Sequence, residues 1–117
     1  MKKISRKGLV KVLDTLCRTL VFKRDGNRCR RCDKTSHLQW AHIYSRRYHS
    51  VRWEPTNSLV LCAGCHMWGH HNPTEFSDWI AFELGPERLA ELNLWRHTRT
   101  KQDLQGLRLW LTAEIAK

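Results

Sequence analysis

The sequence predicts a small α+β fold that is held together by a bound zinc ion. Two Cys-x-x-Cys pairs, separated by residues 33–61, can supply four ligands to one ion. Two short apolar segments with strand character lie between the pairs, and amphipathic helical patterns precede the first pair and follow residue 73. We therefore expect a zinc-bound core at residues 29–71, an N-terminal helix and C-terminal supporting helices.

The length of 117 residues favours one domain over residues 1–117. A domain of this size buries a modest core, so a structural metal would add stability. The sequence has no run of about 18 apolar residues, so we expect no membrane span. The basic N-terminus lacks an apolar signal core. We expect a cytoplasmic protein whose cysteines are metal ligands rather than disulfides.

The net charge of +10 is unevenly distributed along the chain. Residues 1–72 hold 15 Lys/Arg and 4 Asp/Glu, whereas residues 73–117 hold 6 Lys/Arg and 7 Asp/Glu. A solvated, soluble surface is the simpler interpretation of such a charge. The concentration of the excess beside the cysteine pairs favours a polyanionic partner, and we expect that partner to be DNA.

Residues 6–24 have the apolar spacing of an amphipathic helix. One face carries Leu9, Val12, Leu13, Leu16, Cys17, Leu20 and Val21. Cys17 belongs to this apolar face, so we interpret it as a small buried hydrophobe and not as a ligand. Asp25-Gly26-Asn27 is turn chemistry that ends the helix.

Four cysteines form the predicted zinc site: Cys29, Cys32, Cys62 and Cys65. A single Cys-x-x-Cys pair is ambiguous between redox and metal chemistry. Two pairs offer four thiolates to tetrahedral Zn²⁺ at about 2.3 Å each. Four reduced, unligated thiols are the alternative. Zinc binding would contribute folding free energy directly in a small domain.

Residues 38–43 alternate as a strand does, and residues 57–61 form a second short strand. Residues 44–56 between them are a polar loop that carries Arg46, Arg47 and Arg52. Residues 63–71 should be a helix that stops before Asn72-Pro73.

Three helical segments follow in residues 74–117, and we interpret them as a support for the core. Thr74 is expected to cap the first, Pro86 to begin the second and Asp103 to cap the third. Their apolar sides carry Phe76, Trp79, Ile80, Phe82–Leu84, Leu89, Leu92, Trp95, Leu104, Leu107, Leu111 and Ile115.

A histidine–asparagine–histidine series runs through the cysteine frame: His42, Asn57, His66 and His70. Histidine suits proton removal from water, because its ordinary pKa of about 6.5 lies near working pH. His66 and His70 lie one turn apart on the same helix face, so both can hold one divalent ion. Asparagine can orient a loop without competing for the proton. This series favours phosphodiester hydrolysis.

Each of these residues also has a plainer interpretation. His42 can be a partly buried strand histidine, and Asn57 can simply turn the chain. His66 can replace a cysteine in the zinc site. His70 and His71 can be exposed residues at a helix end, where the dipole favours them.

The order of these residues, within AHIYSRR and RWEPTNSLVLCAGCH, resembles the zinc-containing HNH endonucleases of the His-Me finger (ββα-metal) superfamily. The spacings resemble those of the colicin DNases, which lack the cysteines. Over a longer stretch the chain resembles small phage HNH proteins, especially the NinG (Rap)-like recombination nucleases. The residues after Pro73 carry little of the resemblance.

The resemblance implies a role for each matching position. His42 would be the general base, Asn57 would hold its loop, and His66 with His70 would bind a catalytic Mg²⁺, Mn²⁺, Ni²⁺ or Zn²⁺. The products would be a 5′-phosphate and a 3′-hydroxyl. Many family members carry Asp or His where this chain has Ala41, so one expected metal ligand is missing here.

We therefore predict a metal-dependent DNA endonuclease, phage-encoded and working in the bacterial host cell in recombination, processing or packaging of DNA. Arg46, Arg47 and Arg52 are expected to contact phosphates. Coordinated cutting of two strands would favour a homodimer or a phage protein partner. The alternative is a non-catalytic, zinc-stabilised DNA-binding module.

Overall fold

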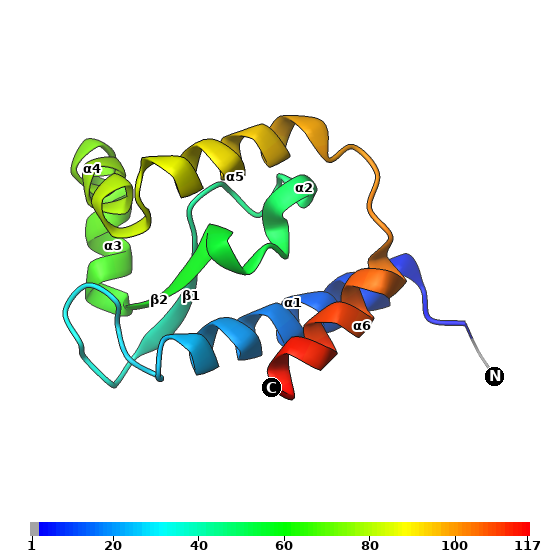
Figure 1. The fold of residues 1–117 in the computed structure, drawn as a ribbon. Helices are drawn as coiled ribbons and strands as arrows, with labels where there is room; N and C mark the ends of the chain where they lie inside the picture. Colours follow the sequence, from blue (N-terminus) through cyan, green and yellow to red (C-terminus); the bar gives the residue numbers. More distant parts are fainter. Residues whose placement is uncertain (1–2) are drawn as a thin grey trace.

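The chain forms the predicted small α+β fold, in which six α-helices pack around a two-stranded antiparallel sheet over residues 3–117, the part that this computed structural model describes (Figure 1). The elements are α1 (Arg6–Arg24), β1 (Leu38–His42), α2 (His49–Arg52), η1 (Pro55–Asn57), β2 (Ser58–Cys62), α3 (Ala63–His71), α4 (Pro73–Leu84), α5 (Pro86–Thr98) and α6 (Leu104–Ile115). None of the helices among these residues is long and apolar enough to cross a membrane.

Helix α1 has the predicted bounds, and local sequence explains both of its ends. The Ser5 side chain accepts a hydrogen bond from the Gly8 amide at 3.0 Å, which satisfies one of the free donors of the first turn. At the other end, Gly26 and Asn27 have positive φ, which an α-helix does not allow. Leu9, Leu13, Cys17 and Val21 recur every four residues and form the buried face.

The sheet pairs β1 with β2 in the register Leu38↔Cys62 to His42↔Ser58. Both strands agree with the prediction to within one residue at each end. Strand β2 is buried along its whole length because helices cover both of its faces. Val60 packs in a cluster with α1 and α6, whereas Leu59 and Leu61 pack in a second cluster with α3 and α4.

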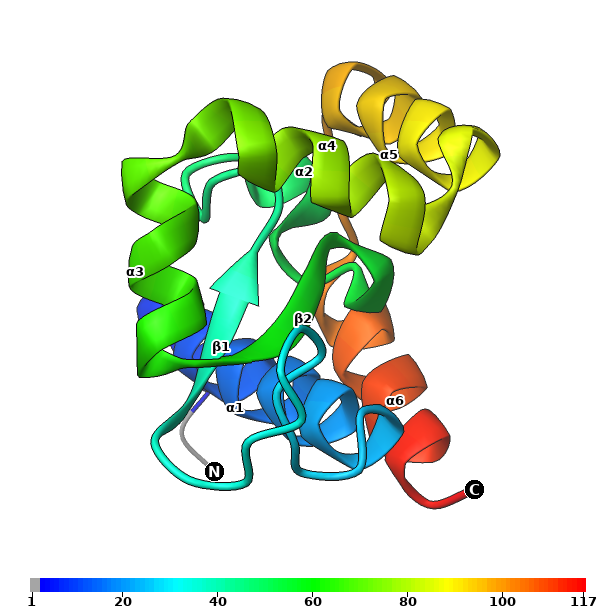
Figure 2. The same ribbon diagram turned by 90° about the vertical axis from the view of Figure 1, so that its left-hand side faces the viewer.

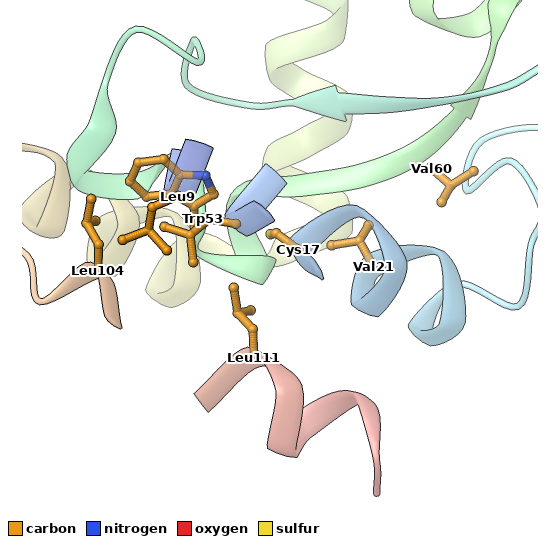
Figure 3. Packing of buried hydrophobic residues seen from close by; sticks show 8 residues of the cluster. Leu9, Cys17, Val21, Trp53, Val60, Leu104 and Leu111 are labelled. Atoms are coloured by element: carbon orange, nitrogen blue, oxygen red, sulfur yellow. The ribbon is translucent and has the colours of Figure 1, made fainter. Parts of the chain in front are cut away.

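The first cluster lies between α1, α6 and the loop that follows β1 (Figure 3). Figure 1 shows α6 lying alongside α1, although the whole sheet separates them in sequence. Leu111 of α6 points toward the buried face of α1 in Figure 3, and Trp53 is enclosed in the same cluster. Burial of one leucine of this kind stabilises the fold by about 1.5–3 kcal/mol. Helix α6 is therefore part of the core.

The second cluster joins the cysteine frame to α3 and α4, which Figure 2 shows beside and above the strands. Gly69 of α3 lies against the ring of Phe76 in α4. A Cβ at Gly69 would lie 2.8 Å from the Phe76 ring, so only glycine allows the two helices to approach this closely.

Three local predictions are wrong. The predicted loop at 44–56 contains α2 and the start of η1, because Trp53 and Val51 are buried and fold the segment back onto the core. Thr74 does not cap α4, which begins at Pro73, since proline suits the first helical position. Phe82 is 86% exposed and does not contribute to the apolar side of α4.

Asp103 caps α6 as predicted, and its side chain accepts a hydrogen bond from the Gly106 amide at 3.0 Å. Helix α5 packs on α2 and η1. The Ser50 hydroxyl of α2 donates a hydrogen bond to the Arg96 carbonyl of α5. Arg99, which follows α5, forms an ion pair with Glu54 at 3.2 Å. The C-terminal helices therefore brace the segment between the two strands.

Candidate functional site

The four predicted cysteine ligands come together at one end of the sheet. All their sulfur atoms lie within 4.8 Å of one another, and the sulfurs of Cys32 and Cys62 are 3.7 Å apart. A tetrahedral zinc with bonds of about 2.3 Å requires sulfur–sulfur edges of about 3.8 Å. A disulfide needs about 2.05 Å, and these cysteines are free thiols. The cluster can therefore hold a zinc ion.

Tight turns present the first cysteine pair. The Asp33 amide donates to the Cys29 carbonyl at 2.9 Å, and the Cys29 amide donates to the Lys34 carbonyl at 2.8 Å. Asp33 has φ of 65°, a left-handed conformation that aspartate tolerates better than most residues. The Arg30 amide donates to the Val60 carbonyl, which attaches this turn to β2.

The second cysteine pair opens helix α3. Cys62 occupies the N-cap position, where its sulfur accepts a hydrogen bond from the Cys65 amide at 3.4 Å. That hydrogen bond is the main reason that the pKa of Cys62 falls to about 7. The helix start therefore favours the thiolate form that zinc requires.

The Arg31 side chain lies beside the sulfur cluster, and the sequence did not single it out. Arg31 donates from Nη1 to the Cys65 sulfur at 3.5 Å, and its guanidinium lies 3.5 Å from the centre of the Trp68 ring. Four thiolates on one zinc carry a net charge of about −2, which a neighbouring cation partly offsets. The position of Arg31 between the two cysteines of a pair is the only sequence signal for this role.

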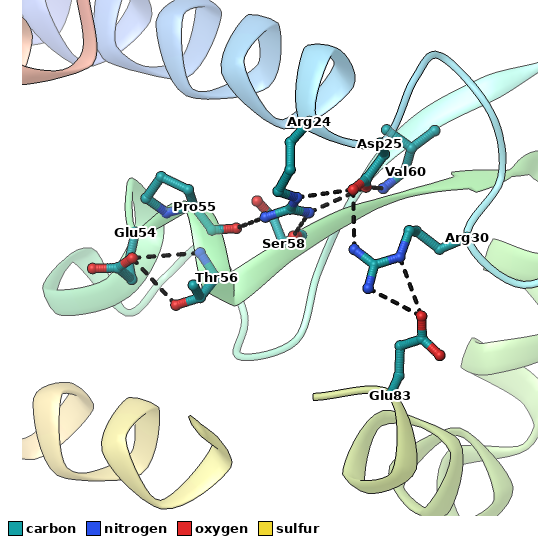
Figure 4. Close-up of polar contacts among 9 residues, drawn as sticks. All are labelled: Arg24, Asp25, Arg30, Glu54, Pro55, Thr56, Ser58, Val60 and Glu83. Carbon is teal, nitrogen blue, oxygen red and sulfur yellow. Dashed lines mark hydrogen bonds and ion pairs between the residues drawn. The ribbon is translucent and has the colours of Figure 1, made fainter. Parts of the chain in front are cut away.

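A buried acid network joins the cysteine end to α1 (Figure 4). The Asp25 carboxylate accepts hydrogen bonds from the Val60 amide at 2.9 Å, from Arg24 at 2.8 Å and from Arg30 at 3.0 Å. Burial alone would raise the pKa of Asp25, but these donors outweigh it and lower the pKa. Arg30 also pairs with Glu83 of α4 at 3.0 Å. These ion pairs connect α1, β2 and α4 beside the cysteine frame.

The three histidines of the predicted site line one cavity of about 520 Å³ at the end of β1. Its lining residues are Trp40, Ala41, His42, Ile43, Ser45, Arg46, His66, Gly69, His70, Pro73 and Phe76. Helix α3, which Figure 2 shows beside β1, supplies the histidine pair. The cavity thus has both polar lining groups, the histidines among them, and the apolar rings of Pro73 and Phe76 from α4.

The His66 and His70 rings are 4.8 Å apart between centroids. A ligating imidazole has its ring centre about 3.2 Å from the ion, given a bond of about 2.1 Å. Two such rings, at an angle of about 90–109° to the ion, have centres about 4.5–5.2 Å apart. The spacing therefore allows both histidines to hold one divalent cation.

Gln39 orients the first of these histidines, and the sequence analysis missed it. The His66 Nδ1–H donates to Gln39 Oε1 at 2.6 Å, which leaves the Nε2 lone pair free for a ligand. Burial is the main cause that lowers the pKa of His66, so the ring favours its neutral form. Strand alternation is the signal that could have identified Gln39, because it lies on the face of β1 that Ala41 shares.

The same alternation explains Ala41. Its side chain packs on the α3 side of the sheet, in the cluster with Leu59 and Leu61. Position 41 is therefore the position of β1 that faces the histidine pair, and alanine supplies no donor atom there. The third protein ligand that the family resemblance predicts would stand at position 41, beside His66 and His70, and alanine cannot supply it.

His42 alternates with Ala41 along β1, but it is the last residue of the strand and also lines the cavity. Its ring packs edge-on against Trp40 with centroids 4.2 Å apart. Its Nε2 lies 3.1 Å from the Arg52 carbonyl. A carbonyl only accepts, so Nε2 carries the proton and Nδ1 carries a free lone pair. Burial lowers the pKa of His42 to about 4, so the ring is neutral at neutral pH.

Asn57 is fully buried and holds the two ends of the segment between the strands together. Its Oδ1 accepts from the Tyr44 amide at 2.9 Å, and its Nδ2 donates to the Tyr44 and Val51 carbonyls at 3.1 Å. The Ile43 amide donates to the Asn57 carbonyl at 2.7 Å. Asn57 does not line the cavity. Its hydrogen bonds instead fix the backbone of the segment between the strands.

The three arginines predicted to contact phosphate differ in environment. Arg46 lines the cavity, and its side chain is 55% exposed. Arg47 is exposed outside the cavity, where it donates to the Tyr48 hydroxyl at 3.0 Å. Arg52 is only 15% exposed and is paired with Asp14 at 2.6 Å. Arg46 is therefore the one of the three that is both accessible and beside the histidines.

Comparison of the chain with protein-family models, with curated proteins and with solved structures finds no match.

Proposed function

We propose that this protein is a zinc-stabilised, metal-dependent DNA endonuclease of the HNH type. The observation that carries the proposal is the cavity that His42, His66 and His70 line together. One histidine there has a free lone pair and is neutral at neutral pH, and the other two are spaced to share one cation. General-base catalysis and metal assistance are the two requirements of phosphodiester hydrolysis.

In the proposed reaction His42 Nδ1 takes a proton from a water molecule as the water oxygen attacks phosphorus. The bond from phosphorus to the 3′ oxygen breaks, and the products are a 5′-phosphate and a 3′-hydroxyl protonated from solvent. The divalent cation, when bound, would stabilise the negative charge on the phosphate and on the departing oxygen.

The remaining residues would act by orientation. The Arg52 carbonyl holds His42 in the tautomer that keeps Nδ1 free. Gln39 does the same for His66 and leaves its Nε2 free. Asn57 keeps the intervening segment folded against the strands. Arg46 would pair with a phosphate at the mouth of the cavity.

DNA is the proposed substrate because of the charge distribution. The +10 excess lies entirely on the part of the chain that builds the cysteine cluster and the cavity. The resemblance of AHIYSRR and RWEPTNSLVLCAGCH to small phage HNH proteins favours a role in phage DNA recombination, processing or packaging inside a bacterial cell.

Plasmid nicking with Mg²⁺, Mn²⁺, Ni²⁺ or Zn²⁺ tests the proposal. We expect metal-dependent nicking that falls about 10²–10⁴-fold in His42→Ala, as for loss of a general base. His71→Ala is the matched control, because His71 is exposed beside His70 but does not line the cavity. The control should cut as the unchanged protein does.

If the unchanged protein cuts no better than His42→Ala with any of the four metals, the chain is not a nuclease. DNA binding without cleavage would then support the alternative, a zinc-stabilised DNA-binding module. The alanine at position 41 is the feature that favours this alternative, since it leaves the cation with two protein ligands.

A further inference from the structure

Asp14 is the single acidic residue of the otherwise basic helix α1, and it lies outside the cavity. Its carboxylate accepts hydrogen bonds from three side chains of the segment between the strands. Trp53 donates from Nε1 at 2.8 Å, Arg52 donates from Nε at 3.0 Å and from Nη2 at 2.6 Å, and Arg46 donates from Nη2 at 3.0 Å. One carboxylate therefore attaches this whole segment to α1.

Two of these donors flank the peptide group that holds His42. The carbonyl that accepts from His42 Nε2 belongs to the peptide between Arg52 and Trp53. The side chains on both sides of that peptide are bound to the same carboxylate, and Trp53 is also enclosed in the core. With both neighbours held, the carbonyl has little freedom to rotate away from the imidazole.

The charge state of Asp14 supports this contact. Burial alone would raise its pKa, but hydrogen bonds from Arg52 and Trp53 and the nearby arginine charges lower it. The carboxylate is thus ionised at neutral pH. A charged acceptor makes shorter and stronger hydrogen bonds than a neutral one, so the two-point contact with Arg52 is a rigid one.

We propose that Asp14 is a positioning residue for His42, acting through the Arg52–Trp53 peptide to hold the imidazole in its Nε2–H tautomer, which keeps the Nδ1 lone pair free. This inference rests on the proposed function for its effect on cleavage. Its structural part, the control of the His42 tautomer, does not depend on catalysis.

Asp25 provides the matched control at the other end of α1. It is a buried carboxylate with a similar set of donors, two arginines and one amide. None of these three donors contacts His42 or Asp14. Loss of either carboxylate charge should destabilise the fold, but only loss of the Asp14 charge should alter His42.

The experiment compares Asp14→Asn with Asp25→Asn in the full chain. The tautomer of His42 is measured by long-range ¹H–¹⁵N correlation of its ring nitrogens, and cleavage is measured as kcat and KM. In Asp14→Asn we expect a smaller Nε2–H fraction and a kcat lower by about tenfold or more, with KM within about twofold, because misplaced catalytic groups affect the chemical step. Asp25→Asn should change neither the tautomer nor kcat.

If Asp14→Asn does not fold, Arg52→Lys tests the same link, since lysine keeps the charge but offers one contact point where arginine offers two. An unchanged tautomer in the folded Asp14 and Arg52 variants would overturn the inference, whatever happens to cleavage. An equal change in Asp25→Asn would also overturn it, because the effect would then be general loss of stability. A chain that cuts no DNA would end the proposed function while the ring measurement still decided the role of Asp14.

Discussion

The cysteine end and the histidine end of the sheet differ in how many donor atoms each could offer to a metal ion. At the cysteine end, four sulfurs lie within 4.8 Å of one another, and Arg31 donates to one of them. At the histidine end, two imidazoles face a cavity of about 520 Å³ with no third donor at Ala41. A closed donor set is typical of structural metals, and an open one is typical of catalytic metals. The contrast implies different consequences for changes at each end.

The largest effect is expected from substitution of one cysteine of the sulfur cluster. Cys62→Ser removes a zinc ligand and the N-cap sulfur of α3 at once. Structural zinc sites contribute about 10–16 kcal/mol of apparent binding free energy at pH 7. We therefore expect the variant to bind no zinc and to have no stable fold that unfolds in a cooperative transition. Zinc content and circular dichroism measure this. Cys17→Ala, in the core away from the cluster, should keep its zinc; a Cys62→Ser protein with normal zinc and stability would contradict the four-cysteine site.

The next effect is the response of the histidine end to acid. The pKa of His42 is about 4 in the folded protein and about 6.5 in an unfolded chain. The unfolded state therefore binds the proton more readily between these values. The stability that neutral His42 contributes is fully present above pH 6.5 and is lost as the pH falls toward 4. As a base, His42 should keep cleavage on a plateau down to about pH 5 and lose it about tenfold per pH unit below 4.

Thermal unfolding of the unchanged protein and of His42→Gln, from pH 7.5 to 4.5, measures the stability part. Glutamine does not titrate, so the difference between the two curves isolates His42 from the zinc thiolates. The advantage of the unchanged protein should shrink as the pH falls. Parallel curves would show that the imidazole is not buried in its neutral form.

A smaller effect is expected when a third protein ligand is added to the histidine end, which makes its donor set more complete. Ala41→Asp places a carboxylate on the strand face that the His66 and His70 pair shares, and the cavity has room for it. We expect the affinity for Mn²⁺ to rise about tenfold, which corresponds to about 1.4 kcal/mol, because a carboxylate is a favourable ligand for a hard divalent cation. Titration calorimetry measures the affinity, and Ala41→Leu is the control of similar size without a donor oxygen. Equal affinities in both variants would mean that position 41 does not face the cation.

The smallest effect separates the arginines. Arg46→Ala should weaken DNA binding and reduce the slope of log affinity against log salt by about one, as expected for one lost phosphate contact. Its effect on stability should be below about 1 kcal/mol, because the Arg46 side of the ion pair is 55% exposed and Asp14 keeps its contacts with Arg52 and Trp53. Arg52→Ala should instead lower the unfolding temperature. Fluorescence anisotropy across a salt series and thermal unfolding distinguish the two, and a common response of both variants would contradict this division.

Local signals account for the parts of the fold that were predicted correctly. Helix α1 has a serine cap, a four-residue apolar spacing and a glycine turn, so its bounds depend on neighbours in sequence alone. The same holds for the Asp103 cap of α6. The cysteine cluster was predictable because paired spacing limits which metal geometry four sulfurs can form.

The missed features depend on contacts between distant segments. Helix α2 forms because Val51 and Trp53 are buried against helices that the local sequence does not reveal. The roles of Asp14 and Gln39 depend on partners 38 and 27 residues away. A lone acid in a basic helix and a polar residue on the face of Ala41 were the available signals, and both needed the packing of helices against the sheet and its connecting segment to be interpreted. The assignments of His42, Asn57, His66 and His70 as catalytic residues stay predictions.

Cys62 of the sulfur cluster caps helix α3, Cys65 lies in the first turn of the helix, and His66 is the very next residue. Because Cys65, His66 and His70 lie on one helix, the direction of the two histidines is fixed relative to the sulfur cluster. A single residue inserted after Cys65 would rotate His66 and His70 by about 100° around the helix axis and out of the cavity. The junction of Cys65 and His66 therefore tolerates no change of length.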